Sequence, residues 1–457
     1  MNFHDSERLA GLLEAEGYIR ADSDASADLV VINTCSVREK AEEKLYTRLG
    51  EIRQAGGDSR RTPVVAVAGC VAQQEGDRLL RRQAPIDVVV GTQSLKRLPA
   101  LVDEALALQR TRVDVNPYED VSFPLGVVRH SDPIRAWVTI IEGCNEFCAF
   151  CVVPYTRGHE RMRPVCDLLA EVEQAAATGH VEIQLLGQIV NHYQAPDDPS
   201  CDFAGLLERV SAVPGIARIR FASPHPRHVT DRLIGAIRDL PAVCKHLHLP
   251  VQSGSNRMLA AMRRRHTRED YLSLVERLRA AVPSIALSTD IIVGFPGETD
   301  ADFEHTLDLV RRAEYQSMYS FKYSPRPNTL AGKRLPDDVT EAEKTRRIQA
   351  LQALQRDNQM ASFRRAVGTV ETVLVDSLSR RRSWELAGRT SGNAVVNLPG
   401  PADWLGRFVP VRITEVMPNS LRGEAAGPAV DRRRPDDTVA GKFPTAGHAH
   451  AGGCHAD

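Results

Sequence analysis

A regular alternation of short apolar runs and amphipathic helices constrains the fold of this chain more than any other feature. It begins at about Arg135, and its strand-like runs are AWVTII, EIQLLG, ARIRFAS, KHLHLPV, IALSTDIIVGF and QSMYSFKYS. The helices expected between them span 164–178, 203–213, 231–240, 268–282 and 300–313. Strands that repeat in one direction with helical crossovers form a parallel sheet with right-handed connections. We therefore expect an open, partial (β/α)6 barrel whose functional loops lie at the C-terminal ends of the strands.

Two smaller units are expected on either side of this barrel. Residues 28–92 alternate DLVVINT, PVVAVAG and IDVVV with charged helical stretches, which is typical of a small open parallel α/β sheet. A polar helix at about 341–365 precedes ETVLVDS, AVVNLPG and RFVPVRITEVM, which indicate a small antiparallel β-barrel. The expected fold class is therefore α/β with a C-terminal β-barrel. The expected regions are an N-terminal domain at 1–110, a linker at 111–129, the partial barrel at 130–362, the β-barrel at 363–428 and a disordered tail at 429–457.

Length and composition exclude several classes of protein. The chain has 457 residues and a formal net charge of -1, so any nucleic-acid contact must come from local basic patches. The sequence has neither a signal peptide nor the ~20 consecutive apolar residues of a membrane span. We expect a cytoplasmic protein without membrane contact. Its nine cysteines then indicate metal or redox chemistry rather than disulfides, because the cytosol keeps thiols reduced.

Three of these cysteines, Cys144, Cys148 and Cys151, follow the first barrel strand at the spacing C-x3-C-x2-C. Cysteine thiolates bind the iron of iron–sulfur clusters, and one loop with this spacing can supply three of them to a single 4Fe-4S cluster. The fourth iron is then open to a small chelating molecule, which in radical-SAM enzymes is S-adenosyl-L-methionine (SAM). The alternative is a zinc site completed by His159, although zinc favours four protein ligands and paired C-x2-C knuckles.

The motifs along the chain are more specific than the cysteine triplet alone. They are NTCSVREKAEEKLYTRLG, the GC at 69–70, EGCNEFCAFCVVPYTRG, LLGQ, LPVQSGS, TDIIVGFPGET and FKYSPRPNT. With them, residues 1 to about 427 resemble the radical-SAM methylthiotransferase family. The branch that the sequence most resembles acts on N6-dimethylallyladenosine (isopentenyladenosine) in tRNA. The resemblance identifies the three expected domains as the methylthiotransferase N-terminal domain, the radical-SAM core and a TRAM-like tRNA-binding domain.

The resemblance implies a radical-SAM sulfur transferase that adds a methylthio group to carbon 2 of the modified adenosine next to the anticodon. It implies SAM as cofactor, tRNA as partner, a reductant as electron donor and a sulfur source, and we expect a monomer. Two alternatives remain open at this point. The same chemistry could act on threonylcarbamoyladenosine or on an aspartate of a ribosomal protein. In the other alternative, the chain is a catalytically impaired tRNA-binding protein that lacks a second cluster.

A second 4Fe-4S cluster, which takes part in sulfur donation, is also implied by the resemblance. Cys35 and Cys70 each follow an N-terminal strand and match two of its three ligands. The matching first ligand would end a strand that precedes Met1. We expect either that the start of the chain is assigned downstream of the true one or that the protein lacks this strand and its thiolate.

Further candidates lie at other strand ends of the barrel. Gly187 and Gln188, in LLGQ, end the second strand, where a close backbone approach would let the amino acid part of SAM bind. The turn after the fifth strand holds Glu298, as a turn residue or as a ligand contact. His246 and His248 alternate on the fourth strand and would share one face, with packing roles favoured over catalysis.

Basic residues form local patches that could contact phosphate. One patch is the run 263–268, for which a solvated helix end is the alternative. The other lies in the C-terminal β-barrel and consists of Arg380, Arg381, Arg382, Arg389, Arg407, Arg412 and Arg422. The tail residues His448, His450, Cys454 and His455 are assigned no role.

Overall fold

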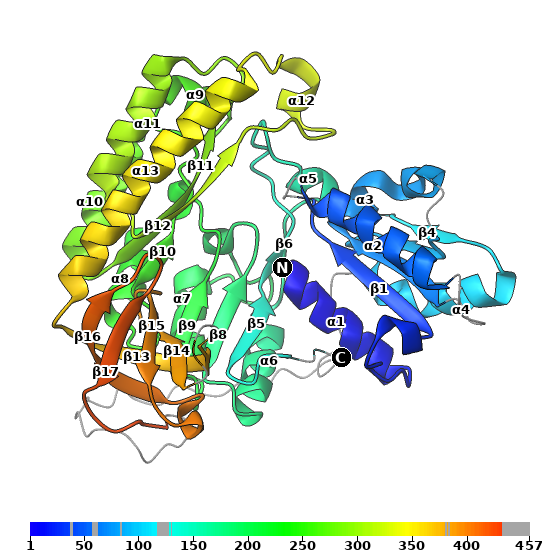
Figure 1. The fold of residues 1–457 in the computed structure, drawn as a ribbon, viewed down its shortest axis with the longest axis horizontal. Helices are drawn as coiled ribbons and strands as arrows, with labels where there is room; N and C mark the ends of the chain where they lie inside the picture. The colour runs from blue at the N-terminus through cyan, green and yellow to red at the C-terminus, as the bar shows by residue number, and fades with distance from the viewer. Residues whose placement is uncertain are drawn as a thin grey trace.

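The computed structural model describes residues 1–36, 40–56, 63–82, 85–116, 128, 130–379, 382 and 384–431. These residues form an α/β sheet, a partial barrel and a closed β-barrel, in that order along the chain (Figure 1). Of the tail predicted at 429–457, residues 432–457 lie outside the described residues, as do Arg380 and Arg381. Within the described part of this tail, Val430 pairs with Phe408 through two backbone hydrogen bonds, so residues 429–431 are not disordered as predicted. Among the helices that the structure describes, none combines the length and the apolar content required to cross a bilayer.

Four parallel strands form the N-terminal sheet in the order β1-β2-β3-β4. They are β1 (Leu29–Thr34), β2 (Val64–Gly69), β3 (Val88–Val90) and β4 (Arg112–Asp114). Ala66 and Ala68 of β2 pack under α1 (Asn2–Ala15) and α4 (Leu98–Leu108). Val65 and Val67 face α2 (Lys40–Gly56) and α3 (Cys70–Glu75) on the other side. Because both faces are buried, these strands are continuous apolar runs, as the sequence predicted.

Two elements of this unit have no clear sequence signal. The buried residues of α1 include His4, Asp5, Glu7 and Arg8 beside Leu9, so much of its buried surface is polar and the helix lacks the apolar periodicity of a core helix. The strand β4 has only three residues and lies inside the segment that we expected to be a linker. It pairs with β3, which adds a fourth strand to the sheet.

Six parallel strands form the partial barrel, in two sheets of order β5-β8-β9 and β10-β11-β12. Their bounds are β5 (Arg135–Thr139), β8 (Glu182–Leu186), β9 (Arg218–Phe221), β10 (His246–His248), β11 (Ala286–Val293) and β12 (Ser317–Lys322). A parallel bridge between Ile219 and Val243 joins the two sheets. The predicted open (β/α)6 barrel is therefore confirmed.

Helices connect these strands at the predicted positions. They are α6 (Val165–Ala177), α7 (Phe203–Ser211), α8 (Asp231–Asp239), α10 (Arg268–Ala281) and α11 (Asp300–Ala313). Local sequence defines where α10 and α11 begin, because Thr267 and Thr299 each form a capping box with an aspartate three residues later. The long helix α13 (Glu341–Ala366) then packs along α11 and β12 (Figure 1).

Short hairpins, helices and 3-10 turns connect the main elements of all three units. The hairpin of β6 (Ile141–Glu142) and β7 (Arg161–Met162) and the helices α5 (Val153–Thr156), α9 (Asn256–Ala261) and α12 (Leu330–Arg334) belong to the barrel. The 3-10 turns are η1 (Asp24–Ser26), η2 (Gly76–Arg82), η3 (Leu95–Arg97), η4 (Val190–His192), η5 (Pro226–His228) and η6 (Ala402–Trp404). The turn η6 belongs to the C-terminal unit.

The C-terminal unit is a closed barrel of strand order β13-β14-β15-β17-β16. Its strands are β13 (Val370–Leu378), β14 (Glu385–Arg389), β15 (Val395–Pro399), β16 (Phe408–Val416) and β17 (Leu421–Ala425). All pairs are antiparallel except β15 with β17. The predicted small barrel is confirmed, and it needs glycine where strands cross closely, since a Cβ on Gly388 would lie 2.3 Å from the carbonyl oxygen of Leu374.

The β14–β15 turn closes one end of the partial barrel. Arg218 and Arg220, at the start of β9, donate hydrogen bonds to the carbonyl oxygens of Arg389 (2.6 Å) and Thr390 (2.7 Å). The Gln316 side chain donates to the carbonyl oxygen of Gly392 at 2.8 Å. These contacts cover the N-terminal ends of the strands. These contacts do not cover the opposite end of the barrel, where the cysteine triplet lies, so a ligand could bind there.

Candidate functional site

The cysteine loop, residues 143–151, follows β6 at the C-terminal end of β5. Backbone hydrogen bonds fix its course: Cys144 N donates to Gly158 O at 3.1 Å, and Ala149 N donates to Met262 O at 3.0 Å. Its first residue must be glycine, because Gly143 has φ +83° and a Cβ there would lie 2.0 Å from the carbonyl oxygen of His159. The loop is thus held between the β6–β7 hairpin and the end of α9.

The three thiols of this loop are close enough to affect one another. Burial, and then the neighbouring Cys148 thiol, raise the pKa of Cys144 to about 11 and that of Cys151 to about 12. The guanidinium of Arg264 donates from Nη1 to Cys148 Sγ at 3.5 Å. A metal or cluster that bound here would displace protons from these thiols, since thiolates are the ligands.

In the structure, His159 does not join the three thiols as a fourth ligand of one metal ion. In the described part of the chain, no three His, Cys, Asp or Glu side chains are arranged to hold a single metal ion. The candidate fourth ligand, His159, is hydrogen bonded through Nδ1 to Asn145 Oδ1 at 3.0 Å. Three neighbouring thiols without a fourth protein ligand match the requirements of an iron–sulfur cluster with one open iron.

Several buried polar atoms near the cysteine loop have no hydrogen-bond partner. They include Gln188 Oε1, His225 Nε2, Arg264 Nε and His266 Nε2. Gly187 lies against the cysteine loop's entry strand, because a Cβ on it would be 3.3 Å from the carbonyl oxygen of Ile141. Buried polar groups normally have partners. A polar ligand bound at this end of the barrel would supply them, which fits the amino acid part of SAM.

Two other cysteines lie at neighbouring strand ends of the N-terminal sheet. Cys35 follows β1 and Cys70 follows β2, and the last paired residues of the two strands are Thr34 and Gly69. Gly69 has φ +92° and a Cβ there would lie 2.3 Å from Asn33 Oδ1, so only glycine permits this approach of the strands. Burial raises the pKa of the Cys70 thiol, and Arg157 opposes the rise.

Arg157 connects the two cysteine sites. It caps α5, six residues after Cys151, and forms an ion pair with Asp5 of α1, with both side chains almost fully buried. Burial alone would lower the pKa of Arg157, but the charges of Asp5 and Cys70 raise it. Gln93, which follows β3, donates to the carbonyl oxygen of Arg157 at 3.0 Å. The cysteine loop and the Cys35–Cys70 pair therefore meet at this contact between α1 and α5.

Arg157 and Arg264 were not identified as site residues from the sequence. Arg157 begins the charged stretch RGHERMR, and nothing in that stretch predicts its contact with Asp5 of α1. Arg264 belongs to the basic run 263–268, but it is 5% exposed and faces the cysteine loop. In the same run, Arg268 pairs with Asp308 of α11. The run is therefore not a continuous phosphate-binding patch.

Other predicted candidates have packing roles or lie in the lumen of the barrel. Glu298 is buried and accepts hydrogen bonds from Gly294 N at 2.6 Å and Arg347 Nη1 at 2.9 Å, so it fastens a turn to α13. His246 Nε2 and His248 Nδ1 both contact Ser288 Oγ, at 3.0 and 2.9 Å. The two histidines therefore share a face, as the alternation predicted.

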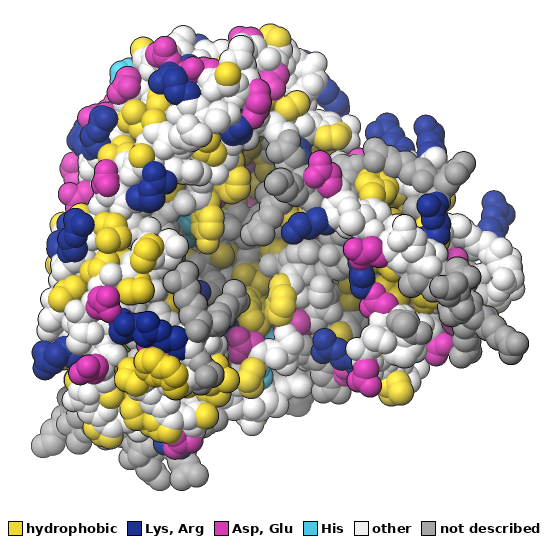
Figure 2. Space-filling model, in the orientation of Figure 1, with side chains coloured by type: hydrophobic (Ala, Val, Ile, Leu, Met, Phe, Trp, Pro, Cys, Tyr) yellow, Lys and Arg dark blue, Asp and Glu magenta, His cyan; other side chains and the backbone are white. Residues whose placement is uncertain are grey.

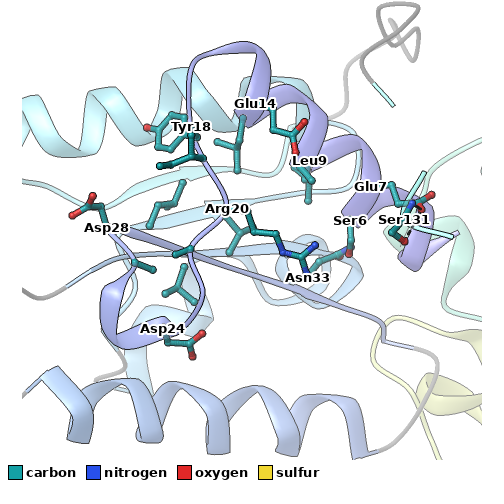
Figure 3. Close-up of a pocket in the computed structure, with 18 of the residues that line it drawn as sticks. Ser6, Glu7, Leu9, Glu14, Tyr18, Arg20, Asp24, Asp28, Asn33 and Ser131 are labelled. Carbon is teal, nitrogen blue, oxygen red and sulfur yellow. Dashed lines mark hydrogen bonds between the residues drawn. The ribbon is translucent and has the colours of Figure 1, made fainter. Parts of the chain in front are cut away.

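A separate cavity of 1390 Å³ lies between α1, the segment that follows it and β1 (Figure 3). At one end, Glu7 Oε1 accepts hydrogen bonds from the Ser131 backbone and hydroxyl, at 2.7 and 3.0 Å. Next to this contact, Asn33 Nδ2 of β1 donates to Ser6 Oγ at 2.9 Å. None of the predicted site residues lines this cavity. The chemistry that the cysteines indicate therefore belongs elsewhere.

Known families match all three units of the chain. Residues 138–310 match the Radical SAM superfamily, residues 1–91 match the Uncharacterized protein family UPF0004, and residues 364–426 match the TRAM domain. Among solved structures, the radical S-adenosylmethionine methyltransferase TsrM from Kitasatospora setae, bound to tryptophan and a SAM analog, aligns with a TM-score of 0.54 at 16% identity. That alignment covers 73% of this chain and 72% of TsrM, and it concerns the fold.

Two curated relatives cover nearly the whole chain. The tRNA-2-methylthio-N(6)-dimethylallyladenosine synthase of Chromobacterium violaceum is 47% identical over 428 residues, which are 93% of this chain and 96% of that protein. The synthase of the same name from Alkalilimnicola ehrlichii is 46% identical over 430 residues, 93% of this chain and 95% of its own length. The chain therefore belongs to the tRNA-2-methylthio-N(6)-dimethylallyladenosine synthase family of radical-SAM enzymes.

Proposed function

We propose that the protein adds a methylthio group to carbon 2 of N6-dimethylallyladenosine in tRNA by radical SAM chemistry. The observation that carries this proposal is the convergence of two cysteine sites on the contact between α1 and α5. A radical enzyme that only cleaved SAM would need the cysteine loop alone. Sulfur insertion needs a second site from which sulfur can reach the same substrate. Cys35 and Cys70 form such a site next to Arg157, which follows the cysteine loop.

Cys144, Cys148 and Cys151 are proposed as ligands of a 4Fe-4S cluster whose open iron binds SAM. When bound, this cluster supplies the electron that cleaves SAM reductively. Gly187 leaves room for the amino acid part of SAM to approach the backbone at the end of β8. Gln188 Oε1 is available to accept a hydrogen bond from the amino group of SAM. Cys144 is buried and Cys148 and Cys151 are partly buried, which limits contact of the loop with water and protects a radical reaction from side reactions.

Cys35 and Cys70 are proposed as ligands of a second 4Fe-4S cluster that takes part in sulfur transfer. The family resemblance implies a third thiolate ligand for this cluster. The Arg157 cation next to Cys70 stabilises anionic sulfur at this site, because opposite charges at close range in a buried environment interact strongly. Asp5 holds that cation in place.

The substrate is proposed to be tRNA that already carries the dimethylallyl group, bound in part by the TRAM domain. Small barrels of this kind contact nucleic acid through exposed strands and basic loops. The reaction also requires a reductant and a sulfur source, which we propose as transient partners of a monomeric enzyme.

The direct test is a reaction with purified protein, reconstituted anaerobically with iron and sulfide and supplied with SAM and dithionite. Its substrate is tRNA containing N6-dimethylallyladenosine, and nucleosides from digested tRNA are identified by mass spectrometry. We expect the 2-methylthio derivative with the wild-type chain and none with Cys144→Ala. Product on threonylcarbamoyladenosine instead would overturn the proposal, as would cleavage of SAM without any methylthio product.

Iron and sulfide analysis of the same preparation tests the cluster assignment separately. Two clusters per chain are expected for the wild type, and one for Cys35→Ala/Cys70→Ala. One cluster in the wild type would contradict the second site and would favour a tRNA-binding protein with impaired catalysis.

A further inference from the structure

Two aromatic side chains are exposed on the edge strand of the partial barrel. Tyr319 and Phe321 of β12 are 62% and 44% exposed, and in the described part of the chain β12 pairs only with β11. Isolated exposed aromatics are common, but two at alternate positions of one strand present a continuous apolar surface. We call Tyr319 and Phe321 the aromatic face.

The aromatic face points toward the lumen of the barrel. Ser320 and Lys322 lie on the other face of β12 and contact α13. Ser320 Oγ accepts a hydrogen bond from Gln352 Nε2 at 3.0 Å, and Lys322 Nζ donates one to Thr345 Oγ1 at 2.8 Å. Side chains of a strand alternate between faces, so Tyr319 and Phe321 point away from α13. Figure 2 shows that the molecule is hollowed between its barrel side and its N-terminal side, with hydrophobic side chains along the hollow.

A polar pair borders the aromatic face. Tyr319 is in register with Asp290 of β11, and Asp290 Oδ1 lies 3.3 Å from His248 Nε2 on β10. The rings of His248 and Tyr319 are 5.9 Å apart at an interplanar angle of 72°, an edge-to-face contact. The strands β10, β11 and β12 thus place the His248–Asp290 pair beside the two aromatic rings.

The same strand leads to the cysteine loop. Tyr323, directly after β12, is buried with Ala149 of the loop and Phe295 in one apolar cluster. Ala331 N donates to Ala149 O at 2.8 Å, which joins the segment after β12 to the loop. At about 3.3 Å per strand residue, Tyr319 is roughly 13 Å from Tyr323 along the chain. The aromatic face therefore lies on the strand that leads to the cysteine loop, within roughly 13 Å along the chain of a residue that packs against it.

We propose that Tyr319 and Phe321 form the stacking surface for the target purine of the substrate RNA, and that the His248–Asp290 pair contacts the polar edge of its ring. This inference rests on the proposed function and names the residues that recognise its substrate. Enzymes that read single RNA bases stack them on aromatic side chains. The apolar N6 substituent adds area that such a surface buries, whereas unmodified adenosine lacks it.

The test measures RNA binding by the reconstituted full chain, without turnover. Two labelled anticodon stem-loops are compared by fluorescence anisotropy, one with N6-dimethylallyladenosine and one with adenosine at the target position. Wild type should bind the modified RNA more tightly. Tyr319→Leu and Phe321→Leu should each raise its Kd roughly tenfold and reduce the preference. Tyr319→Phe should retain binding, and Ser320→Ala, on the α13 face, is the matched control.

Several outcomes overturn the inference. Kd values within twofold of wild type for both leucine variants would do so, as would an equal loss for Ser320→Ala. If wild type itself shows no preference for the modified RNA, the proposed function fails at the level of its substrate. The iron and sulfide content of the leucine variants should equal that of wild type, which shows that the cysteine loop is intact.

A second measurement requires no variant. Wild-type protein is irradiated with a stem-loop that carries 2-azidoadenosine at the target position, and the crosslinked peptide is sequenced. The expected crosslink lies within residues 317–323. A crosslink confined to the C-terminal β-barrel or to the outer surface of α13 would exclude the aromatic face as the base-binding site.

Discussion

Arg264 lies between two residues with an unfavourable backbone conformation. Arg263 and Arg265 have φ of 58° and 55°, in the left-handed region that costs a non-glycine residue about 1 kcal/mol or more. Arg264 itself donates to Pro250 O at 2.8 Å and to Cys148 Sγ. Strained turns persist where the surrounding contacts determine them. We infer that this turn serves to place a buried cation beside the cysteine loop.

Replacing Arg264 by glutamine should lower the reduction potential of the cluster bound by that loop. A nearby cation favours the reduced, more negative state of a cluster, so its removal favours the oxidised state. The expected shift is roughly 50 mV or more, since about 59 mV corresponds to a tenfold change in a one-electron equilibrium. The measurement is a redox titration of the reconstituted protein followed by electron paramagnetic resonance.

Arg263→Gln is the matched control, because Arg263 belongs to the same turn but is exposed. It should leave the potential unchanged. Equal potentials for Arg264→Gln and wild type would show that Arg264 only packs against the loop.

His246 should make the protein sensitive to mild acid. Burial and then the charge of Arg220 lower its pKa to about 3, whereas an unfolded histidine titrates near 6.5. Between these values the unfolded chain binds the extra proton, so this contribution to stability is present above pH 6.5 and is lost as pH falls. For one proton, the free energy of unfolding changes by at most about 1.4 kcal/mol per pH unit. The Tm of wild type should fall more between pH 7 and pH 5 than that of His246→Gln. Parallel decreases would contradict this assignment.

At the scale of elements, the contact between α1 and α5 is the most vulnerable point. Asp5→Ala leaves the buried Arg157 without its carboxylate, and breaking a buried ion pair typically costs about 3–5 kcal/mol. We expect a clear loss in the free energy of unfolding by urea.

The double variant Asp5→Leu/Arg157→Met tests this reasoning, since exchanging both partners for apolar residues is often neutral. It should be more stable than Asp5→Ala, but it should lose methylthio transfer because no cation remains near Cys70. A single variant as stable as wild type would show that the ion pair does not hold α1 to the barrel.

The strands and helices of the barrel were predicted well because each has a strong local pattern. Runs such as EIQLLG and IALSTDIIVGF are long, apolar and bounded by helices with capping residues, and both occur as β8 and β11. The elements that were missed lack such patterns. The helix α1 buries His4 and Arg8 through partners on the barrel, Thr139 and Glu142, that only the tertiary fold supplies.

At the scale of the whole molecule, the sequence predicted that the cysteines of both sites follow strands, but it did not predict how the two sites contact each other. Cys35 and Cys151 are far apart in sequence, and Arg157 joins their sites because α3, which begins at Cys70, packs against α5 and Asp5 of α1 pairs with Arg157. The basic residues of the C-terminal β-barrel show the same limit. Arg422 pairs with Glu385 at 3.3 Å and Glu415 at 3.1 Å. A count of arginines therefore overestimates the cationic surface available to tRNA.

We propose that this chain converts N6-dimethylallyladenosine in tRNA to its 2-methylthio derivative. The most direct measurement is the nucleoside composition of tRNA from a bacterial strain that lacks its own synthase and expresses this chain. We predict that the N6-dimethylallyladenosine peak decreases and the 2-methylthio peak appears, and that Cys148→Ala abolishes the change. Unchanged N6-dimethylallyladenosine in cells that contain the folded, cluster-loaded protein would contradict it.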